Sequence, residues 1–218
     1  MPIDLIKELT KLRKAILTMG ANVEQRVRDA VTSLIERDFE TAQRVRRGDG
    51  EINAMEIDIE AECLRILALS HPVAGDLRFV LAVMRINANL ERVGDLAKSI
   101  AKRALDLQEQ GYYELPESLH TMASGAQQML ADALSALSNE DAEMARRVRR
   151  ADDRIDDLQK EVFVWAQQEI ASNVARIEAV IDILSTARKL ERIGDQSTNI
   201  AEDVIFLSEG SMVRHTRA

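Results

Sequence analysis

Apolar residues recur at alternating intervals of four and three near the start of the chain. The series runs through Leu5, Leu9, Leu12, Ile16, Met19 and Val23. This spacing places the side chains on one face of a helix that packs along its whole length in a bundle. The pattern predicts a long helix over residues 4–35.

A second long pattern of the same kind lies in the middle of the chain and predicts a helix over residues 76–107. Its apolar positions are Val83, Ile86, Leu90, Val93, Ala97, Ile100, Ala104 and Leu107. Pro72 and Gly75 turn the chain just before it, and Asp76 is the expected N-cap.

Four further helices complete the prediction. Residues 36–40 read as a turn, and a helix then continues to Leu69, with Gly48 and Gly50 as the expected site of a kink. Gly111 and Pro116 mark the boundary between two halves of the chain. The second half is expected to hold helices over residues 116–137, 141–171 and 176–207.

The two halves repeat each other. LERVGDLA begins at Leu90 and the similar segment LERIGDQS at Leu190, an offset of 100. VRRGDGEIN from Val45 is similar to VRRADDRID from Val148, at an offset of 103. A repeat of this length indicates two related three-helix units rather than a short-period solenoid. We therefore expect an all-α protein of two tandem, pseudo-symmetric three-helix bundles with six long helices, divided into residues 1–110 and 111–218.

Composition supports helices and narrows the range of ligands. Aromatic residues make up 3% of the chain and there are three prolines, which disfavours sheets. The formal net charge of −8 argues against nucleic acid as a partner and favours cations.

Cys63 is the only cysteine, so an internal disulfide is excluded, and we expect this residue in the core. The first residues lack a signal-like apolar run, and no segment approaches the ~18 apolar residues of a membrane span. These features predict a cytoplasmic protein whose membrane association, if any, is peripheral.

The repeated motif carries a pair of carboxylates in each half, Glu91 with Asp95 and Glu191 with Asp195. Residues four apart share a helix face, and two carboxylates at that spacing repel each other. A bound cation removes the repulsion, and carboxylate oxygens suit Mg²⁺, Mn²⁺, Ca²⁺ or iron. Gly94 and Gly194 lie inside the helices, where glycine is best explained by the close approach of another helix or a ligand.

In two antiparallel helices, residues that are equally far from the connecting turn lie side by side. Counting residues from each turn therefore places further polar residues next to these pairs. Asp152 and Asp156 fall opposite Glu191 and Asp195. In the first half, Asn53 falls opposite Asp95, and Asp49 lies roughly a turn further on. The sequence thus predicts a multi-carboxylate metal site in each half, with ordinary surface charge as the alternative.

Other motifs carry less chemistry. The basic runs at residues 44–47 and 146–150 are interpreted as solvated helix faces, and Arg92 and Arg192 as salt-bridge partners of neighbouring acids. The histidines stand far apart with no ExxH arrangement, which disfavours a di-iron oxidase. No phosphate-binding loop, GxSxG or HExxH is present, so no catalytic apparatus is evident.

Three segments together resemble the PhoU family, the accessory regulators of phosphate-specific transport. They are HPVAGDLRFV from His71, LERVGDLAKSIA from Leu90 and LERIGDQSTNIAE from Leu190. The resemblance extends from Leu5 to Leu207. It implies an all-α protein, often a homodimer, that acts in the cytoplasm near the inner face of the membrane.

The resemblance also implies a function and partners. Family members regulate phosphate uptake and the phosphate-starvation response negatively, and are thought to link the ATPase of the phosphate ABC transporter to a sensor histidine kinase. No enzymatic reaction is established for them. The alternative for this chain is chemistry at its carboxylate clusters, namely iron storage or phosphoesterase activity.

Metal ions are implied as well, because family members carry paired E(D)xxxD motifs that hold metals. The matching positions here are Glu91 and Asp95, Glu191 and Asp195, and Asp152 and Asp156. The pattern departs at Asp49, since Asn53 follows four residues later, although asparagine can still ligate through its carbonyl oxygen. The identity of the metal stays open among iron, zinc, magnesium and manganese.

Overall fold

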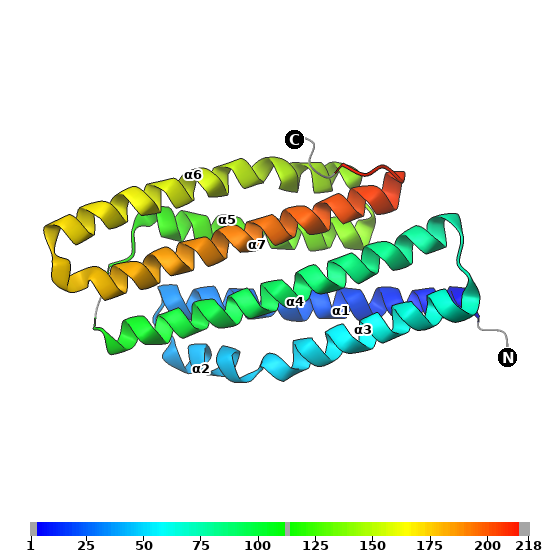
Figure 1. The fold of residues 1–218 in the computed structure, drawn as a ribbon, viewed down its shortest axis with the longest axis horizontal. Helices are drawn as coiled ribbons and strands as arrows, with labels where there is room; N and C mark the ends of the chain where they lie inside the picture. The colour runs from blue at the N-terminus through cyan, green and yellow to red at the C-terminus, as the bar shows by residue number, and fades with distance from the viewer. Residues whose placement is uncertain (1–3, 112–113, 214–218) are drawn as a thin grey trace.

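The computed structural model describes residues 4–111 and 114–213, apart from the side chain of Asp49. Within these ranges the chain is helical and forms no strand (Figure 1). The helices are α1 (Leu5–Ile35), α2 (Phe39–Arg47), α3 (Asp49–Ser70), α4 (Ala74–Glu109), α5 (Glu117–Asn139), α6 (Ala142–Ser172) and α7 (Ile177–Glu209), and a 3₁₀ turn, η1 (Val174–Arg176), precedes α7.

The helices form two groups, α1–α4 and α5–α7, that lie side by side. Each group folds as a bundle of long antiparallel helices, and α4 packs against α7 where the groups meet in the middle of the molecule (Figure 1). A smaller contact joins α1 to α5. The predicted architecture of six long helices in two bundles is confirmed, with the second long helix divided into α2 and α3.

The division between α2 and α3 falls at Gly48, one of the two glycines predicted to mark a kink. Arg26 of α1 donates a hydrogen bond to the Gly48 carbonyl at this break. The turn before α2 is shorter than predicted, because Asp38 caps the helix by accepting a hydrogen bond from the Thr41 amide at 3.0 Å.

The predicted N-cap at Asp76 is wrong. α4 begins two residues earlier, at Ala74, with Val73 in the cap position. Asp76 lies in the first turn, where its negative charge still complements the positive end of the helix dipole. His71 and Ala74 both take φ of +46°, so the turn that reverses the chain is made by residues other than glycine.

The predicted apolar face of α1 lies in the core. Leu12, Met19 and Val23 are fully buried, whereas Leu5 and Leu9 at the start of the helix are only partly buried. Cys63 is also fully buried, as predicted, and burial raises the pKa of its thiol to about 12. This thiol is therefore a packing residue and unreactive at neutral pH.

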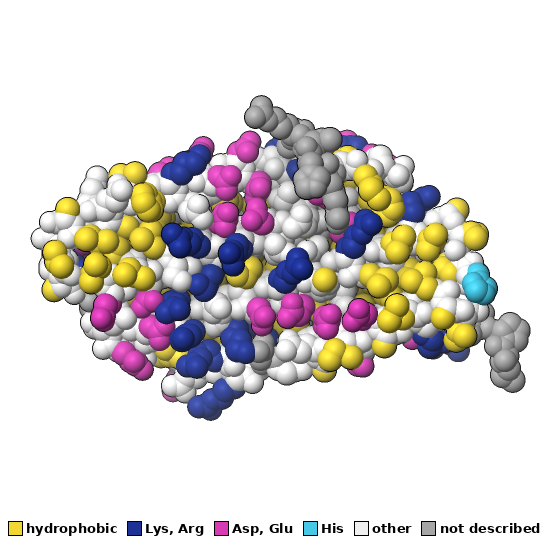
Figure 2. Space-filling model, in the orientation of Figure 1, with side chains coloured by type: hydrophobic (Ala, Val, Ile, Leu, Met, Phe, Trp, Pro, Cys, Tyr) yellow, Lys and Arg dark blue, Asp and Glu magenta, His cyan; other side chains and the backbone are white. Residues whose placement is uncertain are grey.

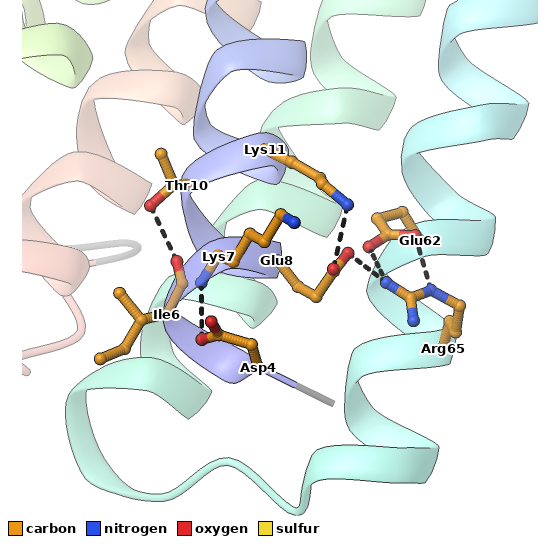
Figure 3. A network of polar contacts seen from close by, with 8 residues as sticks. All are labelled: Asp4, Ile6, Lys7, Glu8, Thr10, Lys11, Glu62 and Arg65. Carbon is orange, nitrogen blue, oxygen red and sulfur yellow. Dashed lines mark hydrogen bonds and ion pairs between the residues drawn. The ribbon is translucent and has the colours of Figure 1, made fainter. Parts of the chain in front are cut away.

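A polar network fixes the start of α1 against the end of α3 (Figure 3). Asp4 caps α1 by accepting a hydrogen bond from the Lys7 amide at 3.3 Å. Glu8 pairs with Lys11 at 3.0 Å on its own helix and with Arg65 across the bundle.

No helix in residues 4–111 or 114–213 combines the length and the hydropathy that crossing a membrane would require.

Candidate metal centre on the repeated helices

Gly94 and Gly194 allow close contact between the last two helices of each half. A Cβ atom at Gly94 would lie 3.1 Å from Cδ1 of Ile52 in α3, and one at Gly194 would lie 3.3 Å from Oδ1 of Asp152 in α6. Both distances are tighter than most Cβ contacts. The glycines are thus explained by the approach of a neighbouring helix, and in the second half this approach brings in a carboxylate.

Four carboxylates gather around Gly194. Burial, followed by the charges of Asp195, Asp156 and Glu191, raises the pKa of Asp152 to about 6. Burial and neighbouring carboxylates also raise the pKa values of Glu191 and Asp195. The structure therefore brings together the four residues that counting from the turn placed at one level.

Asp152 and Glu191 are half-buried, and Asp156 and Asp195 are exposed. Among the described residues, the charge of Arg192 acts on Glu191 and Asp195, where it is the smallest influence on their pKa values, and the charge of Lys160 acts on Asp156. In Figure 2 acidic side chains cluster over α6 and α7, a second acidic row follows α3 and α4, and basic side chains lie between them. The second-half group thus opens to solvent with its mutual repulsion largely unrelieved.

The corresponding group in the first half is described only in part. Glu91 is half-buried, and Asp95 and Asn53 are exposed on α4 and α3. The side chain of Asp49 lies outside the described residues. A metal site in this half stays a prediction.

Hard cations fit the donor set of the second half. Four carboxylates offer oxygen ligands alone, as Mg²⁺, Mn²⁺ and iron favour. Among the described residues, no group of three or more His, Cys, Asp or Glu side chains is already arranged to coordinate a metal ion. Asp156 and Asp195 are exposed and free to change rotamer, so they would have to turn inward to complete a coordination shell.

The basic run at residues 146–150 differs from its interpretation as a solvated face. The side chain of Arg149 is 10% exposed and lies 3.4 Å from Glu202, and Arg146 pairs with Glu209 at 2.7 Å. These arginines tie α6 to the end of α7. No signal in the run itself identified the partners, which lie on another helix.

Two buried acids between the halves were also missed by the sequence patterns. Asp182 and Asp203 are 7% and 1% exposed on α7. Each pairs with an arginine of α4: Arg103 lies 2.8 Å from Asp182, and Arg85 lies 3.3 Å from Asp203. The sequence pattern that could have identified them is an acidic residue among the apolar positions of a helix, which indicates a buried ion pair.

The fold and the acidic face define a class: tandem three-helix repeat proteins with a duplicated carboxylate motif. Comparison with known families identifies the family within that class. The PhoU domain matches residues 16–104 and again residues 119–204. The chain belongs to the PhoU family.

Individual relatives and solved structures agree with this assignment. A phosphate-specific transport system accessory protein PhoU homolog from Pseudomonas aeruginosa is 40% identical over 95% of this chain and 86% of its own length. The phosphate-specific transport system accessory protein PhoU of Escherichia coli is 36% identical over 95% of this chain and 86% of its own length.

Two crystal structures share the fold. PhoU from Pseudomonas aeruginosa superposes with a TM-score of 0.91 at 38% identity, covering 95% of this chain and all of that one. The phosphate transport system regulatory protein PhoU from Streptococcus pneumoniae gives a TM-score of 0.85 at 32% identity, covering 96% of this chain and 99% of that one.

Proposed function

We propose that this protein is a negative regulator of phosphate uptake and of phosphate-starvation signalling. The observation that supports this most strongly is the match to two PhoU domains in order, together with relatives named as accessory proteins of phosphate transport that align over 95% of the chain. A function shared by full-length relatives is a better guide than the fold alone, because one fold hosts many functions.

The proposed mechanism is that of an adaptor without an active site. The helical surface would bind the ATPase of the phosphate ABC transporter and a sensor histidine kinase at the cytoplasmic side of the membrane, with the protein acting as a homodimer. Iron, zinc, magnesium or manganese bound at Glu191, Asp195, Asp152 and Asp156 would relieve the repulsion among these carboxylates and stiffen the contact between α6 and α7. The equivalent first-half ligands are Glu91, Asp95, Asp49 and Asn53.

Complementation tests the regulatory role. The chain is expressed in Escherichia coli that lacks its own PhoU, and a phosphate-starvation reporter is measured in high phosphate. Repression of the reporter is expected, and a reporter that stays fully active would contradict the proposal. Pull-downs from the native cells in high and low phosphate should recover the transporter ATPase or the kinase.

One observation favours a second function, metal-dependent phosphoester hydrolysis. The carboxylates of the second-half group act on one another electrostatically, and such oxygen ligands hold the cations that activate water in metal-dependent hydrolysis. Metal-loaded protein would then hydrolyse a generic phosphoester, and Glu91→Ala combined with Glu191→Ala would abolish the turnover. Absence of turnover in the metal-loaded wild type leaves the regulatory role alone.

A further inference from the structure

The contact between α4 and α7 contains ion pairs as well as apolar packing. The two helices run antiparallel, and ion pairs lie towards both ends: Arg103 with Asp182, and Arg85 with Asp203. Lys189 lies on α7 between the two acids of these pairs.

Lys189 is half-buried, and its ammonium group bonds to neutral acceptors. Its ammonium group donates to the Ser185 hydroxyl at 2.7 Å and to the Ser185 carbonyl at 3.2 Å. Three guanidinium groups act on it, those of Arg103, Arg192 and Arg188. A half-buried ammonium group among other cations is unfavourable unless an anion compensates it.

One acid near this cluster is already engaged, and two others, Glu191 and Asp195, act on Arg192. Asp182 also acts on Lys189, but one of its oxygens accepts from Arg103 at 2.8 Å and the other from Gln110 at 2.9 Å. Arg103 bonds to Asp106 as well, at 2.8 Å. Within residues 4–111 and 114–213, neither Arg188 nor Lys189 forms an ion pair, so the positive charge next to Ser185 lacks a direct counter-charge.

Two of the three cations occur in the second repeat alone, whereas Arg192 corresponds to Arg92 of the first repeat. At the offset of 100, Arg188 corresponds to Ala88 and Lys189 to Asn89. Asn89 is buried, at 6% exposed, which shows that an uncharged side chain fits this level of the fold. Arg188 and Lys189 are therefore an addition to the scaffold and are not required by its packing.

We infer that Arg188, Lys189 and Arg192 form an anion site for a phosphate group, one site per chain, at the junction of the two halves. Arginine presents forked donors to phosphate oxygens, and lysine adds a compact charge. The choice of phosphate over other oxyanions rests on the proposed function. The chemistry is the same for free inorganic phosphate and for a phosphate monoester in a lipid headgroup.

Titration of the full chain tests this site. The protein is first stripped of metal with a chelator, so that phosphate cannot bind through an ion at the carboxylates. One arm measures inorganic phosphate by isothermal titration calorimetry. The other measures co-sedimentation with phosphatidylcholine vesicles that contain or lack phosphatidic acid, which separates the free ligand from a lipid headgroup.

The decisive variant introduces the residues of the first repeat, Arg188→Ala with Lys189→Asn. Binding in the responding arm should weaken about tenfold or more, the loss of roughly one charge-assisted hydrogen bond. The control, Arg46→Ala with Arg47→Asn on the exposed face of α2, removes the same charge and should bind like the wild type. Arg188→Glu, a change at an exposed side chain, provides a second test should the double variant fold poorly.

Absence of wild-type binding in both arms would overturn the site, as would equal binding by wild type and the first-repeat variant. Neither result bears on the regulatory role, which the reporter measures in cells. A regulator that represses the reporter but binds no phosphate would refute only this inference.

Discussion

The two halves of the molecule carry the same motif in different electrostatic surroundings. Each half carries LERxGD on its last helix, α4 or α7, and these two helices pack against each other. In both helices the motif glycine allows a close contact with the preceding helix. In the second half Asp152 lies against that glycine and Asp156 follows, whereas the first half has Asn53 in place of Asp156. The comparison shows that packing residues were kept in both copies while the charges around them diverged.

The junction between the halves should be the most sensitive part of this comparison. Arg85→Ala removes an ion-pair partner of Asp203, which is 1% exposed. Because the carboxylate is buried while the Arg85 side chain is 31% exposed, loss of this partner should lower the free energy of unfolding by about 2 kcal/mol, measured by urea denaturation. Lys160→Ala breaks an exposed pair with Asp157 and should change little. Equal effects of the two variants would show that the junction does not depend on this pair.

Metal content should separate the halves. Wild-type protein is expected to carry divalent or ferric ions by mass spectrometry, and Asp95→Ala with Asp195→Ala should lose them. The second half has more carboxylates and is expected to hold its metal more tightly than the first half. Asp195→Ala should therefore bind metal more weakly than Asp95→Ala, by about tenfold or roughly 1.4 kcal/mol. Equal metal in wild type and the double variant would mean that the pairs are ordinary surface charge.

The stability of metal-free protein should depend on the protonation of Asp152. Its folded-state pKa of about 6 lies above its ordinary value of 3.8. The folded state therefore binds this proton more tightly, and the resulting stability is lost as pH rises from about 4 through about 6. Since Asp152 is only half-buried, we discount the effect to about 1 kcal/mol.

Asp152→Asn checks this linkage. At pH 7 the metal-free variant should be more stable than the wild type, and the difference should shrink towards pH 4.5. Thermal denaturation at several pH values gives both quantities. A difference that stays constant with pH would contradict the raised pKa of Asp152.

The smallest effects are expected at the two motif glycines. Gly94→Ala and Gly194→Ala each gain about 1 kcal/mol of helix propensity and lose a similar amount to crowding, so stability should change by less than about 1 kcal/mol. Gly194→Ala should nevertheless weaken metal binding, because its new Cβ presses on the Asp152 carboxylate. Unchanged metal affinity in this variant would place Asp152 outside the coordination shell.

Much of the candidate site could be predicted because antiparallel helices joined by a short turn fix the level of each residue. Counting from the turn placed Asp152 and Asp156 opposite Glu191 and Asp195, and the electrostatic influence of these residues on one another confirms the placement. The start of α4 could not be placed in the same way. Caps depend on the backbone of the turn, and that turn uses left-handed residues which no local rule assigns to His71 or Ala74.

The helices, their pairing within each half and the duplication could all be predicted from the amino-acid pattern, because apolar spacing of three and four is a local property that every turn of helix repeats. Which charges become buried depends on how the helices pack in three dimensions. Arg85 meets Asp203 across 118 residues and Arg103 meets Asp182 across 79. Such pairs depend on how the two bundles dock, and the docking is set by the shape of whole helix faces rather than by any short motif.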